Sequence, residues 1–460
     1  MSHLAALLIA LQILPSAAAS TFCDAGSSHW AGTVEIGSKS RDMFFMYFES
    51  RSVPAMDPLI FWLNGVRGPG ASSMTGVFYE IGPCLVNSEG NATTKNPLSW
   101  TNFANLVFID QPMGVGFSRP DEPALWANNL AEATVDFDKF LDGFFELFPG
   151  LDDAERDIHM AGESFAGHYI PHFTSRTRRN FSSIVLVDPY IDLAESALGI
   201  YDHCCVGENP HPGLNKTACK AVEKRLDVCK TQGDVCRSTY DVSLCEKAED
   251  SCFWAIMEWF DNGPEGHPTH NPFDDRLICD NPERLGMCGG MGTEEVTRFL
   301  NQTAVKQALG QPNVSFSEIN YAFNAIWTGQ PEMNLPSTRE ISHLLDIKNT
   351  PIIVLNGNND IIGNTEGMIK ILDSLPWGSH DEYEKQSLSP WWYEDSRGHQ
   401  RRGGEFKQFE KLAVVTVDEA GHMNMADQRR GTSAIIKRWL SKASLGRNEK
   451  KGSSGRSGSE

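Results

Sequence analysis

The sequence predicts a doubly wound α/β domain that is interrupted by a cysteine-rich insertion. Short, continuous apolar runs recur along the chain, and such runs are typical of parallel strands covered on both faces. They alternate with a segment of helical spacing, which is the pattern of an α/β domain. Nine of the eleven cysteines lie between Cys204 and Cys288, in a part of the chain without such runs. A length of 460 residues suits one large domain with an insertion, or two domains.

Six apolar runs have the length of a strand. Four precede the insertion and two follow it: residues 59–63, 105–110, 157–162, 182–188, 350–356 and 411–418. Residues 122–148 carry apolar side chains at helical spacing and are long enough to cross over between parallel strands. We therefore expect a core made of residues 20–191 and 325–442, with the insertion at 192–324.

The two ends of the chain differ from this core. Residues 1–19 run apolar from Leu4 to Leu14 and end in small residues, as a secretory signal peptide does, although the usual early Lys or Arg is missing. The alternative is a buried N-terminal helix. Residues 443–460 are rich in Gly, Ser and Lys and are expected to be disordered. No later run reaches the roughly 18 apolar residues that span a bilayer, so we expect no membrane span.

Charge and cysteine usage narrow the compartment and the partners. The net charge of −20 argues against nucleic acid and anionic membranes as partners. Clustered cysteines indicate disulfides in an oxidising compartment. A zinc site is the alternative, because four histidines lie in the same region: His203, His211, His267 and His270. The paired CxxC spacing typical of zinc sites is missing, however. Five N-x-S/T sequons predict glycosylation, at Asn91, Asn180, Asn215, Asn301 and Asn313.

A candidate nucleophile follows the third predicted strand. In "GESFAG", Ser164 sits between small residues where a strand passes into a helix. Such a turn lifts a serine hydroxyl clear of the sheet, and the next backbone N–H faces the oxyanion. The second glycine of the strict G-x-S-x-G pattern is Ala166, which is still small. A structural serine in a strand–helix loop is the alternative.

A serine nucleophile needs a base and a carboxylate that orients it. Asp360 comes just after one predicted strand, and His422 lies in a glycine-containing loop after another. Their order along the chain, Ser, Asp and His, is that of the nucleophile-elbow enzymes. His168 and His172 are spaced like metal ligands, but Pro171 interrupts them and we interpret them as structural.

The loop "NGVRGPG", residues 64–70, follows an early strand of the predicted sheet. A second backbone N–H for the oxyanion must come from this position. Two donors aimed at the developing negative oxygen are commonly the largest single contribution to such catalysis.

Several motifs, in order, resemble the serine carboxypeptidases of the carboxypeptidase Y type. The resemblance covers nearly all of the chain except the tail. It implies an α/β-hydrolase fold that uses no cofactor or metal, releases amino acids from peptide C-termini through an acyl-enzyme, and works in a secreted or vacuole-like compartment. The motifs are "FFMYFESR" (44–51), "WLNG..GPGASSMTGVFYEIGP" (62–83), "NPLSWTNFANLVFIDQPMGVGFS" (96–118), "GESFAGHYIP" (162–171), "NPFDDR" (271–276), "NGNNDIIGN" (356–364) and "AGHM" (420–423).

The resemblance assigns roles residue by residue. It makes Ser164, Asp360 and His422 the triad, and the N–H groups of Gly68 and Phe165 the oxyanion hole. It also implies a set that binds the substrate's C-terminal carboxylate, namely Trp62, Asn64, Gly65, Glu80 and Glu163. Two glutamates beside a carboxylate cannot all stay ionised, so one keeps a proton and donates it. Such a site is expected to work best at acid pH.

By analogy with the family, four disulfides are expected in or beside the insertion. They are Cys205–Cys219, Cys229–Cys252, Cys236–Cys245 and Cys279–Cys288. The family's cysteine in "GPGCSS" is Ala71, so its long-range bridge is expected to be absent. The pairing of Cys23, Cys84 and Cys204 stays open, and Cys23–Cys84 is one option.

Three departures from the family bear on function. Asn358 replaces an aspartate, and "HMVP" has become "HMNM" at 422–425, where Met423 is a candidate substrate contact. Val66 and Arg67 are two extra residues inside the family's "NGGPG" loop. They are an error of the gene model, a tolerated bulge, or a functional change in which Arg67 contacts substrate.

Two other functions stay open beside the peptidase. Some relatives on this scaffold are acyltransferases or esterases, but the retained Asn64, Glu80 and Glu163 favour a peptide carboxylate as ligand. The interrupted loop also permits a catalytically impaired, binding-only relative, against which the complete triad argues. The oligomeric state does not follow from the sequence.

Overall fold

The computed structural model describes residues 22–37, 40–65, 69–120, 122–207, 211, 213–254, 256–257, 270–279 and 293–446. The predicted signal peptide, residues 1–19, lies outside the described residues. The same holds for Val66, Arg67, Gly68 and His267.

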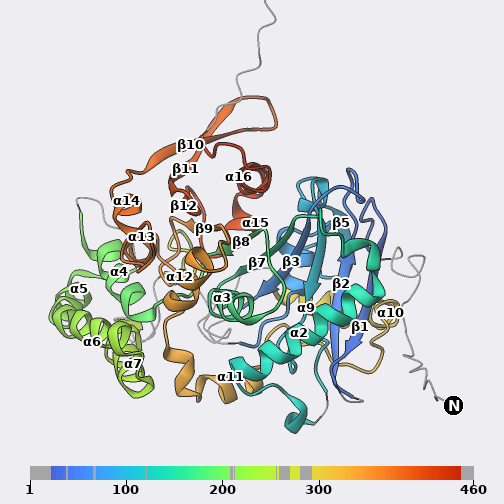
Figure 1. Ribbon diagram of the computed structural model, residues 1–460, viewed down its shortest axis with the longest axis horizontal. Helices are drawn as coiled ribbons and strands as arrows, with labels where there is room; N and C mark the ends of the chain where they lie inside the picture. Colours follow the sequence, from blue (N-terminus) through green and yellow to red (C-terminus); the bar gives the residue numbers. More distant parts are fainter. Residues whose placement is uncertain are drawn as a thin grey trace, which may run out of the picture.

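A ten-stranded mixed sheet forms the centre of the molecule (Figure 1). Its strand order is β1-β2-β6-β3-β7-β8-β9-β12-β11-β10. The strands are β1 (His29–Glu35), β2 (Asp42–Phe48), β3 (Leu59–Asn64), β6 (Asn105–Ile109), β7 (Ile158–Glu163), β8 (Ser183–Val187), β9 (Ile352–Gly357), β10 (Ser389–Glu394), β11 (Gln400–Phe409) and β12 (Leu412–Val417). Strands β4 (Cys84–Val86) and β5 (Thr93–Lys95) form a separate hairpin.

The six central strands in this order, β6, β3, β7, β8, β9 and β12, run parallel, and all six were predicted. Antiparallel strands flank them on both sides: β2 pairs with β6, and β11 pairs with β12. Because the parallel strands share a direction, their carboxyl ends meet at one edge of the sheet, where ligands bind in open α/β folds. The fold is thus the expected α/β-hydrolase class with an added antiparallel strand pair at each edge.

Helices cover both faces of the sheet (Figure 1). Those before the insertion and after it include α2 (Leu130–Leu147), α3 (Ala166–Arg176), α13 (Thr365–Asp373), α14 (His380–Glu384), α15 (Asn424–Asp427) and α16 (Arg429–Leu440). The predicted crossover helix 122–148 starts later than expected, at Leu130. Its N-cap is Asn129, whose side chain accepts a hydrogen bond from the backbone N–H of Glu132.

Alternating side chains of the central strands enter two hydrophobic cores. In β3, Leu59, Phe61 and Leu63 pack on one side, with the phenylalanines of α2. Ile60 and Trp62 pack on the other side, with side chains of α16. This period of two is the geometry of a strand whose faces are both buried, and it explains the continuous apolar runs of the sequence.

The chain between β8 and β9 forms helices, and the described residues of this segment add no strand to the sheet. They include α4 (Leu193–Cys205), α5 (Lys216–Glu223), α6 (Leu226–Thr239), α7 (Val242–Glu249), α9 (Thr293–Leu300), α10 (Thr303–Ala308), α11 (Tyr321–Thr328) and α12 (Thr338–Asp346). Helices α5, α6 and α7 gather beside the sheet in Figure 1. The predicted start of the insertion, residue 192, is the N-cap of α4, but its predicted end, residue 324, falls inside α11.

The inserted segment shares its hydrophobic core with the sheet. Ala197 and Ile200 of α4 belong to the same buried cluster as the α2 face, whereas Phe299 of α9 belongs to the opposite one. A segment that completes the core on both sides is part of the domain. Among the described residues, the insertion adds only a small cluster of its own, made of Ala194, Cys236, Cys245 and Ala248.

Disulfides link the expected region, with one difference. Cys23–Cys84, Cys205–Cys219 and Cys236–Cys245 are formed. Cys279 is disulfide-bonded, and its predicted partner Cys288 lies outside the described residues. The predicted Cys229–Cys252 bridge is not formed: both are buried thiols in hydrogen-bond contact, and Cys229 Sγ donates to the Ser251 carbonyl. Cys204 is a buried thiol outside these bridges.

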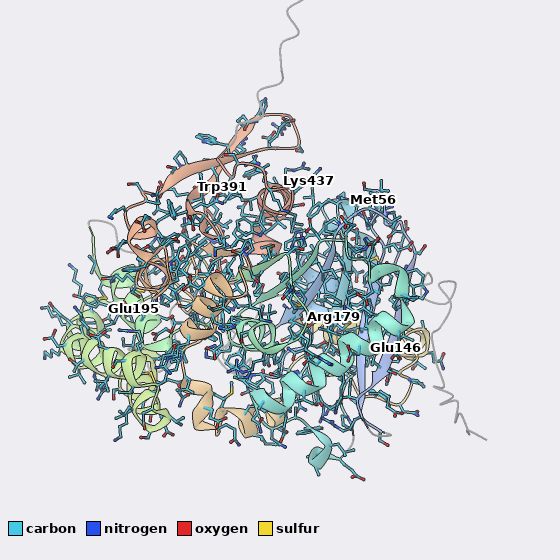
Figure 2. The ribbon with its side chains drawn as sticks, in the orientation of Figure 1. Met56, Glu146, Arg179, Glu195, Trp391 and Lys437 are labelled. Carbon is cyan, nitrogen blue, oxygen red and sulfur yellow. A yellow bond between two sulfur atoms is a disulfide. The ribbon has the colours of Figure 1, made fainter. Side chains whose placement is uncertain are left out.

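The C-terminal end is ordered further than predicted. Arg438 Nη1 donates to the carbonyl of Leu445 at 3.0 Å, and Leu445 is 1% exposed. The predicted disorder of residues 443–446 is therefore wrong, because Leu445 buries its side chain in the core; residues 447–460 are outside the described residues. At the neighbouring sheet edge, Trp391 of β10 is buried and donates from Nε1 to the Thr416 carbonyl (Figure 2).

Four of the five sequon asparagines are exposed: Asn91, Asn180, Asn215 and Asn313. Asn301 differs, because its Nδ2 donates both hydrogens, to the carbonyls of Thr297 and Phe316. A glycan on that nitrogen would break one of these bonds, so the structure disfavours the predicted glycosylation at Asn301.

Candidate active site

Ser164 lies in a sharp turn between β7 and α3. Its φ of +60° is a left-handed backbone conformation that residues other than glycine rarely adopt. The turn is fixed by hydrogen bonds: the Ser164 N–H donates to the Val187 carbonyl, and its own carbonyl accepts from Gly167 and Tyr190. This is the strand–turn–helix geometry that the "GESFAG" motif predicts.

Close backbone approaches explain the glycines around this turn. A methyl group on Gly162 would lie 2.4 Å from the Leu63 carbonyl oxygen and 2.7 Å from Ala166 Cβ. Because Gly162 has no side chain, there is room for Ala166 at the position of the motif's second glycine. A methyl group on Gly65 would lie 2.5 Å from the backbone nitrogen of Phe165, so the "NG" backbone passes directly beside the predicted oxyanion donor.

Asp360 and His422 form a buried pair. His422 Nδ1 and Asp360 Oδ2 are 2.6 Å apart, and both side chains are at most 5% exposed. The other carboxylate oxygen, Oδ1, accepts from the Ile362 N–H at 2.9 Å. A carboxylate in this position holds the imidazole in the tautomer whose Nε2 can accept a proton.

The three predicted triad residues come from the carboxyl ends of β7, β9 and β12, at one edge of the sheet. Within the described residues, no hydrogen bond joins the Ser164 hydroxyl to His422. Such bonds commonly tighten only when substrate is bound. The pairing of nucleophile and base therefore stays a prediction.

A segment of the insertion holds the loops that carry Asp360 and His422. The N–H of His422 donates to the Phe273 carbonyl at 2.8 Å, and the N–H of Ile361 donates to the Pro272 carbonyl at 3.1 Å. Asp275 and Asn359 exchange a backbone bond of 2.9 Å and a side-chain bond of 2.7 Å. We name residues 271–276 the strap. Its motif, "NPFDDR", was recognised in the sequence, but its role was not.

Asp188 is a site residue that the sequence analysis missed. It follows β8, between the strands that carry Ser164 and Asp360, and it accepts from the Gly357 N–H at 2.7 Å and from Asn424 Nδ2 at 2.5 Å. Burial and the charge of Asp360 raise its pKa well above the usual range. Its place at the carboxyl end of a predicted strand was the available signal.

Asn424 explains one departure from the family. It is fully buried and ties the His422 loop to Asp188, so this side chain of "HMNM" fixes the loop and does not line a pocket. Met423 is 8% exposed and packs with Tyr79, Phe273 and Ala426. At another of these departures, Asn358 Nδ2 donates to Asp418 at 2.9 Å.

Glu80 and Glu163 form a buried carboxyl pair. Trp62 Nε1 donates to Asn64 Oδ1 at 2.6 Å, and Asn64 Nδ2 donates to Glu80 Oε1 at 2.9 Å. Burial raises the pKa of Glu80. Burial and the charge of Glu80 raise the pKa of Glu163 well above its usual range, because their hydrogen bond requires a proton on one of the two groups.

One shared proton satisfies this pair. With both groups ionised, Glu80 Oε2 and Glu163 Oε2 would be buried acceptors without a donor. The fold thus pairs Glu163, the residue immediately before Ser164 in the sequence, with the distant Glu80. Of the predicted carboxylate-binding set, the structure brings Trp62, Asn64, Gly65, Glu80 and Glu163 together.

Asp110 anchors the far side of the interrupted loop. It accepts from the Ser72 hydroxyl at 2.6 Å and from the backbone N–H groups of Ser73 and Phe117. Burial raises the pKa of Asp110 to about 6, although these hydrogen bonds oppose the shift. The structure fixes the loop from Pro69 onward, whereas the predicted donor Gly68 and the candidate contact Arg67 are outside the described residues.

The elbow, the buried Asp–His pair and the sheet define the chain as an α/β hydrolase with a serine at the nucleophile position. The family model described as serine carboxypeptidase matches residues 21–442. The chain belongs to the serine carboxypeptidase family.

Individual relatives agree with this assignment. Carboxypeptidase Y of Komagataella phaffii is 31% identical over 421 residues, which are 90% of this chain and 76% of that protein. The vacuolar serine-type carboxypeptidase ATG42 of Saccharomyces cerevisiae is 31% identical over 423 residues, 90% of this chain and 79% of its own. The crystal structure of Kex1(delta)p, a prohormone-processing carboxypeptidase of S. cerevisiae, superposes with a TM-score of 0.75 and 24% identity, covering 91% of this chain and 92% of that one.

The buried carboxyl groups contribute stability that is present in acid solution and is lost as the pH rises. Asp110, Glu80, Glu163 and Asp188 have raised pKa values, so their contribution is fully present below the unfolded values near 4 and is lost as pH rises through the folded ones. For Asp110, whose folded pKa is about 6, the loss is on the order of 3 kcal/mol.

Urea unfolding at pH 5, 6 and 7.5 checks this expectation. The buried His159, His168 and His172, whose pKa values are lowered, change stability in the opposite direction over this range, so the comparison with Glu163→Gln carries the test. Relative to this variant, which imitates the protonated acid, the free energy of unfolding of the wild type should fall as the pH rises. Parallel curves for the two proteins would contradict the assignment of the proton.

Proposed function

We propose that the chain removes single amino acids from the C-termini of peptides, with Ser164 as nucleophile, His422 as general base and Asp360 as the group that orients it. Membership of the serine carboxypeptidase family supports the reaction class. The observation that carries the residue assignment is the buried Glu80–Glu163 pair, in which Glu163 directly precedes the strained Ser164 turn.

The chemistry follows from this arrangement. Ser164 Oγ attacks the carbonyl carbon of the last peptide bond while His422 Nε2 takes its proton. The carbonyl oxygen becomes an oxyanion between the N–H of Phe165 and that of Gly68. His422 then returns the proton to the leaving amine, and the C–N bond breaks to leave an acyl-enzyme. A water, deprotonated by His422, attacks the ester carbon and releases the shortened peptide.

The carboxyl pair supplies the specificity for chain ends. A substrate carboxylate near Glu163 meets a protonated acid that donates a hydrogen bond to it, and Asn64 holds Glu80 from behind. An ionised glutamate in the same place would repel the substrate. Binding therefore weakens as the shared proton is lost, which supports an acid pH optimum.

Ser164→Ala is expected to lose labelling by a serine-directed fluorophosphonate and to lower kcat by a factor on the order of 10⁴ or more. Ser175→Ala is the matched control, because Ser175 lies on the next helix and bonds only locally to His172 and Arg176. Mass spectrometry should find the label on Ser164 alone. Full activity of Ser164→Ala would remove the triad assignment.

The carboxyl pair predicts how activity depends on the substrate's end. An N-blocked dipeptide with a free C-terminal carboxylate should show a much lower KM at pH 5 than its amide. In Glu163→Gln the side chain keeps a neutral donor at all pH values, so kcat/KM should decline less between pH 5 and pH 7.5. Equal kcat/KM values for acid and amide would favour the esterase or acyltransferase reading.

Val66 and Arg67 carry the alternative of an impaired enzyme. If they displace the N–H of Gly68, their deletion should raise kcat by a factor on the order of 10²–10³, the contribution of one oxyanion donor. If Arg67 meets the substrate carboxylate, deletion should instead raise KM and move the optimum to lower pH. Unchanged constants would show a harmless bulge.

We also propose that the chain enters the secretory pathway and acts outside the cell or in a vacuole-like compartment. Formed disulfides and exposed sequons at Asn91, Asn180, Asn215 and Asn313 support this. None of the described helices is long and apolar enough to cross a membrane. The net charge of −20 keeps nucleic acid an unexpected partner.

A further inference from the structure

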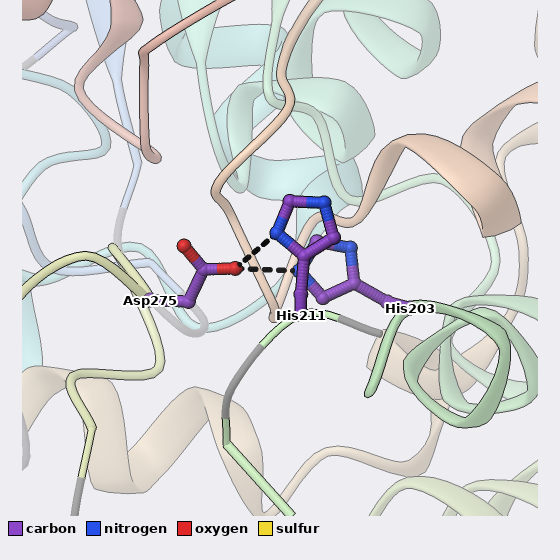
Figure 3. Close-up of side chains that lie close together, drawn as sticks. All are labelled: His203, His211 and Asp275. Atoms are coloured by element: carbon purple, nitrogen blue, oxygen red, sulfur yellow. Dashed lines mark hydrogen bonds and ion pairs between the residues drawn. The ribbon is translucent and has the colours of Figure 1, made fainter. Parts of the chain in front are cut away.

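Two histidines and an aspartate meet where the insertion joins the core (Figure 3). His203 lies near the end of α4, His211 follows it, and Asp275 belongs to the strap. Asp275 Oδ2 is 3.0 Å from His203 Nε2 and 2.7 Å from His211 Nδ1. The two imidazole rings stack with their centroids 4.2 Å apart.

These three atoms form a donor set of the kind that binds zinc. All lie within 4.8 Å of one another. Bonds of about 2.0–2.2 Å to a tetrahedral ion place its ligand atoms roughly 3.3 Å apart, so the two imidazole nitrogens, at 3.0 and 2.7 Å from Asp275 Oδ2, must move away from it by about 0.3 and 0.6 Å. The side chains of His203 and Asp275 are at most 1% exposed, whereas His211 is 39% exposed and leaves an entry path from solvent.

The remaining polar atoms of the two buried ligands already have partners. His203 Nδ1 lies 3.0 Å from Glu366 Oε2, and Asp275 Oδ1 accepts from Asn359 Nδ2 at 2.7 Å. A carboxylate behind a coordinating histidine fixes its tautomer and makes it a better ligand. The outer shell of a metal centre is thus present, and none of the cysteines that the structure describes belongs to the cluster.

We propose that His203 Nε2, His211 Nδ1 and Asp275 Oδ2 bind one Zn²⁺, with a solvent molecule as fourth ligand. Of the four histidines that suggested zinc in the sequence, His203 and His211 belong to this site. His270 is not a ligand, since its Nδ1 lies 2.8 Å from the Asp275 carbonyl oxygen, and His267 is outside the described residues.

A proton is the competing occupant. Burial alone would lower the pKa of His203, but hydrogen bonds to Asp275 and Glu366 outweigh it and raise the pKa to about 9. In the metal-free protein His203 is therefore cationic and stabilises the two carboxylates. Zinc replaces this proton and adds the partly exposed His211 to the centre, which a proton on His203 does not require.

The consequence of zinc binding is a fixed strap. Asp275 is three residues or fewer from Pro272 and Phe273, whose carbonyls hold the loops of Asp360 and His422. Anchoring Asp275 to α4 through a metal therefore ties the insertion to the two loops that carry the base and its partner. The centre is structural, because its ligands do not touch the triad side chains.

Isothermal titration of the secreted, metal-stripped protein with ZnCl₂ at pH 7.5 tests the proposal. We expect one Zn²⁺ per chain and, in His211→Ala, at least a tenfold loss of affinity. Glu366→Gln should weaken binding by roughly 10–100-fold through the outer shell. His399→Ala, which removes an imidazole that is 67% exposed on the distant β10–β11 hairpin, should leave the affinity unchanged.

Two further measurements separate a metal centre from an ion pair. Co²⁺ bound to the wild type should show the visible absorption of a four-coordinate site, and excess Zn²⁺ should raise the melting temperature of the wild type but not of His211→Ala. His211 is chosen because its side chain is partly exposed, so the variant is expected to fold. Equal zinc affinity in His211→Ala, or no binding by the wild type, would show that the cluster is an ion pair only.

Discussion

Four carboxyl groups are buried at one edge of the sheet, and their mutual repulsion is the constraint on which the rest of the site depends. Like charges in a low-dielectric environment cannot all remain ionised. Asp360 is stabilised by His422 and by the Ile362 N–H, and Asp188 by Gly357 and Asn424. Glu80 receives a hydrogen bond from Asn64, and Glu163 is satisfied only by a proton. The negative charge that remains, on Asp360, faces the imidazole of His422.

Buried carboxyl groups are stabilised in a different way on the other side of the strap. There, Asp275 and Glu366 flank His203, and opposite charge lowers the pKa values of both carboxyl groups despite their burial. The carboxyl groups at the sheet edge therefore tend to keep protons, whereas those beside His203 stay ionised and pair with its positive charge. The strap lies between the two, and its backbone carbonyls reach the catalytic loops while its Asp275 side chain reaches α4. An insertion far away in sequence thus becomes part of the catalytic scaffold.

The parts of this structure that sequence could predict are those with continuous burial or a local motif. All six central strands are apolar on both faces, and Ser164, Asp360 and His422 stand in recognisable contexts. Strand β11 was missed because it carries a mixed pattern: Gln400, Arg401 and Arg402 are exposed, and its burial follows from its pairing with β12. Strand β2 was missed although Met43–Phe48 is a continuous buried apolar run like those of the central strands. Disulfide pairing by analogy failed at Cys229 and Cys252, which lie side by side as thiols.

The unpredicted functional contacts all join residues distant in the chain. His203 and Asp275 are 72 positions apart, and Asn424 and Asp188 are 236 apart. Nothing in local periodicity marks such partners, because each residue is an ordinary polar side chain until the sheet brings the loops together. Asp188 was the exception in principle, since a carboxylate at the end of a buried parallel strand must meet whatever follows the neighbouring strands. Sheet order is therefore the step that turns a list of polar residues into a site: once β8 lies between β7 and β9, Asp188 must face both the serine turn and the Asp360 loop, and a compensating donor such as Asn424 becomes a physical requirement.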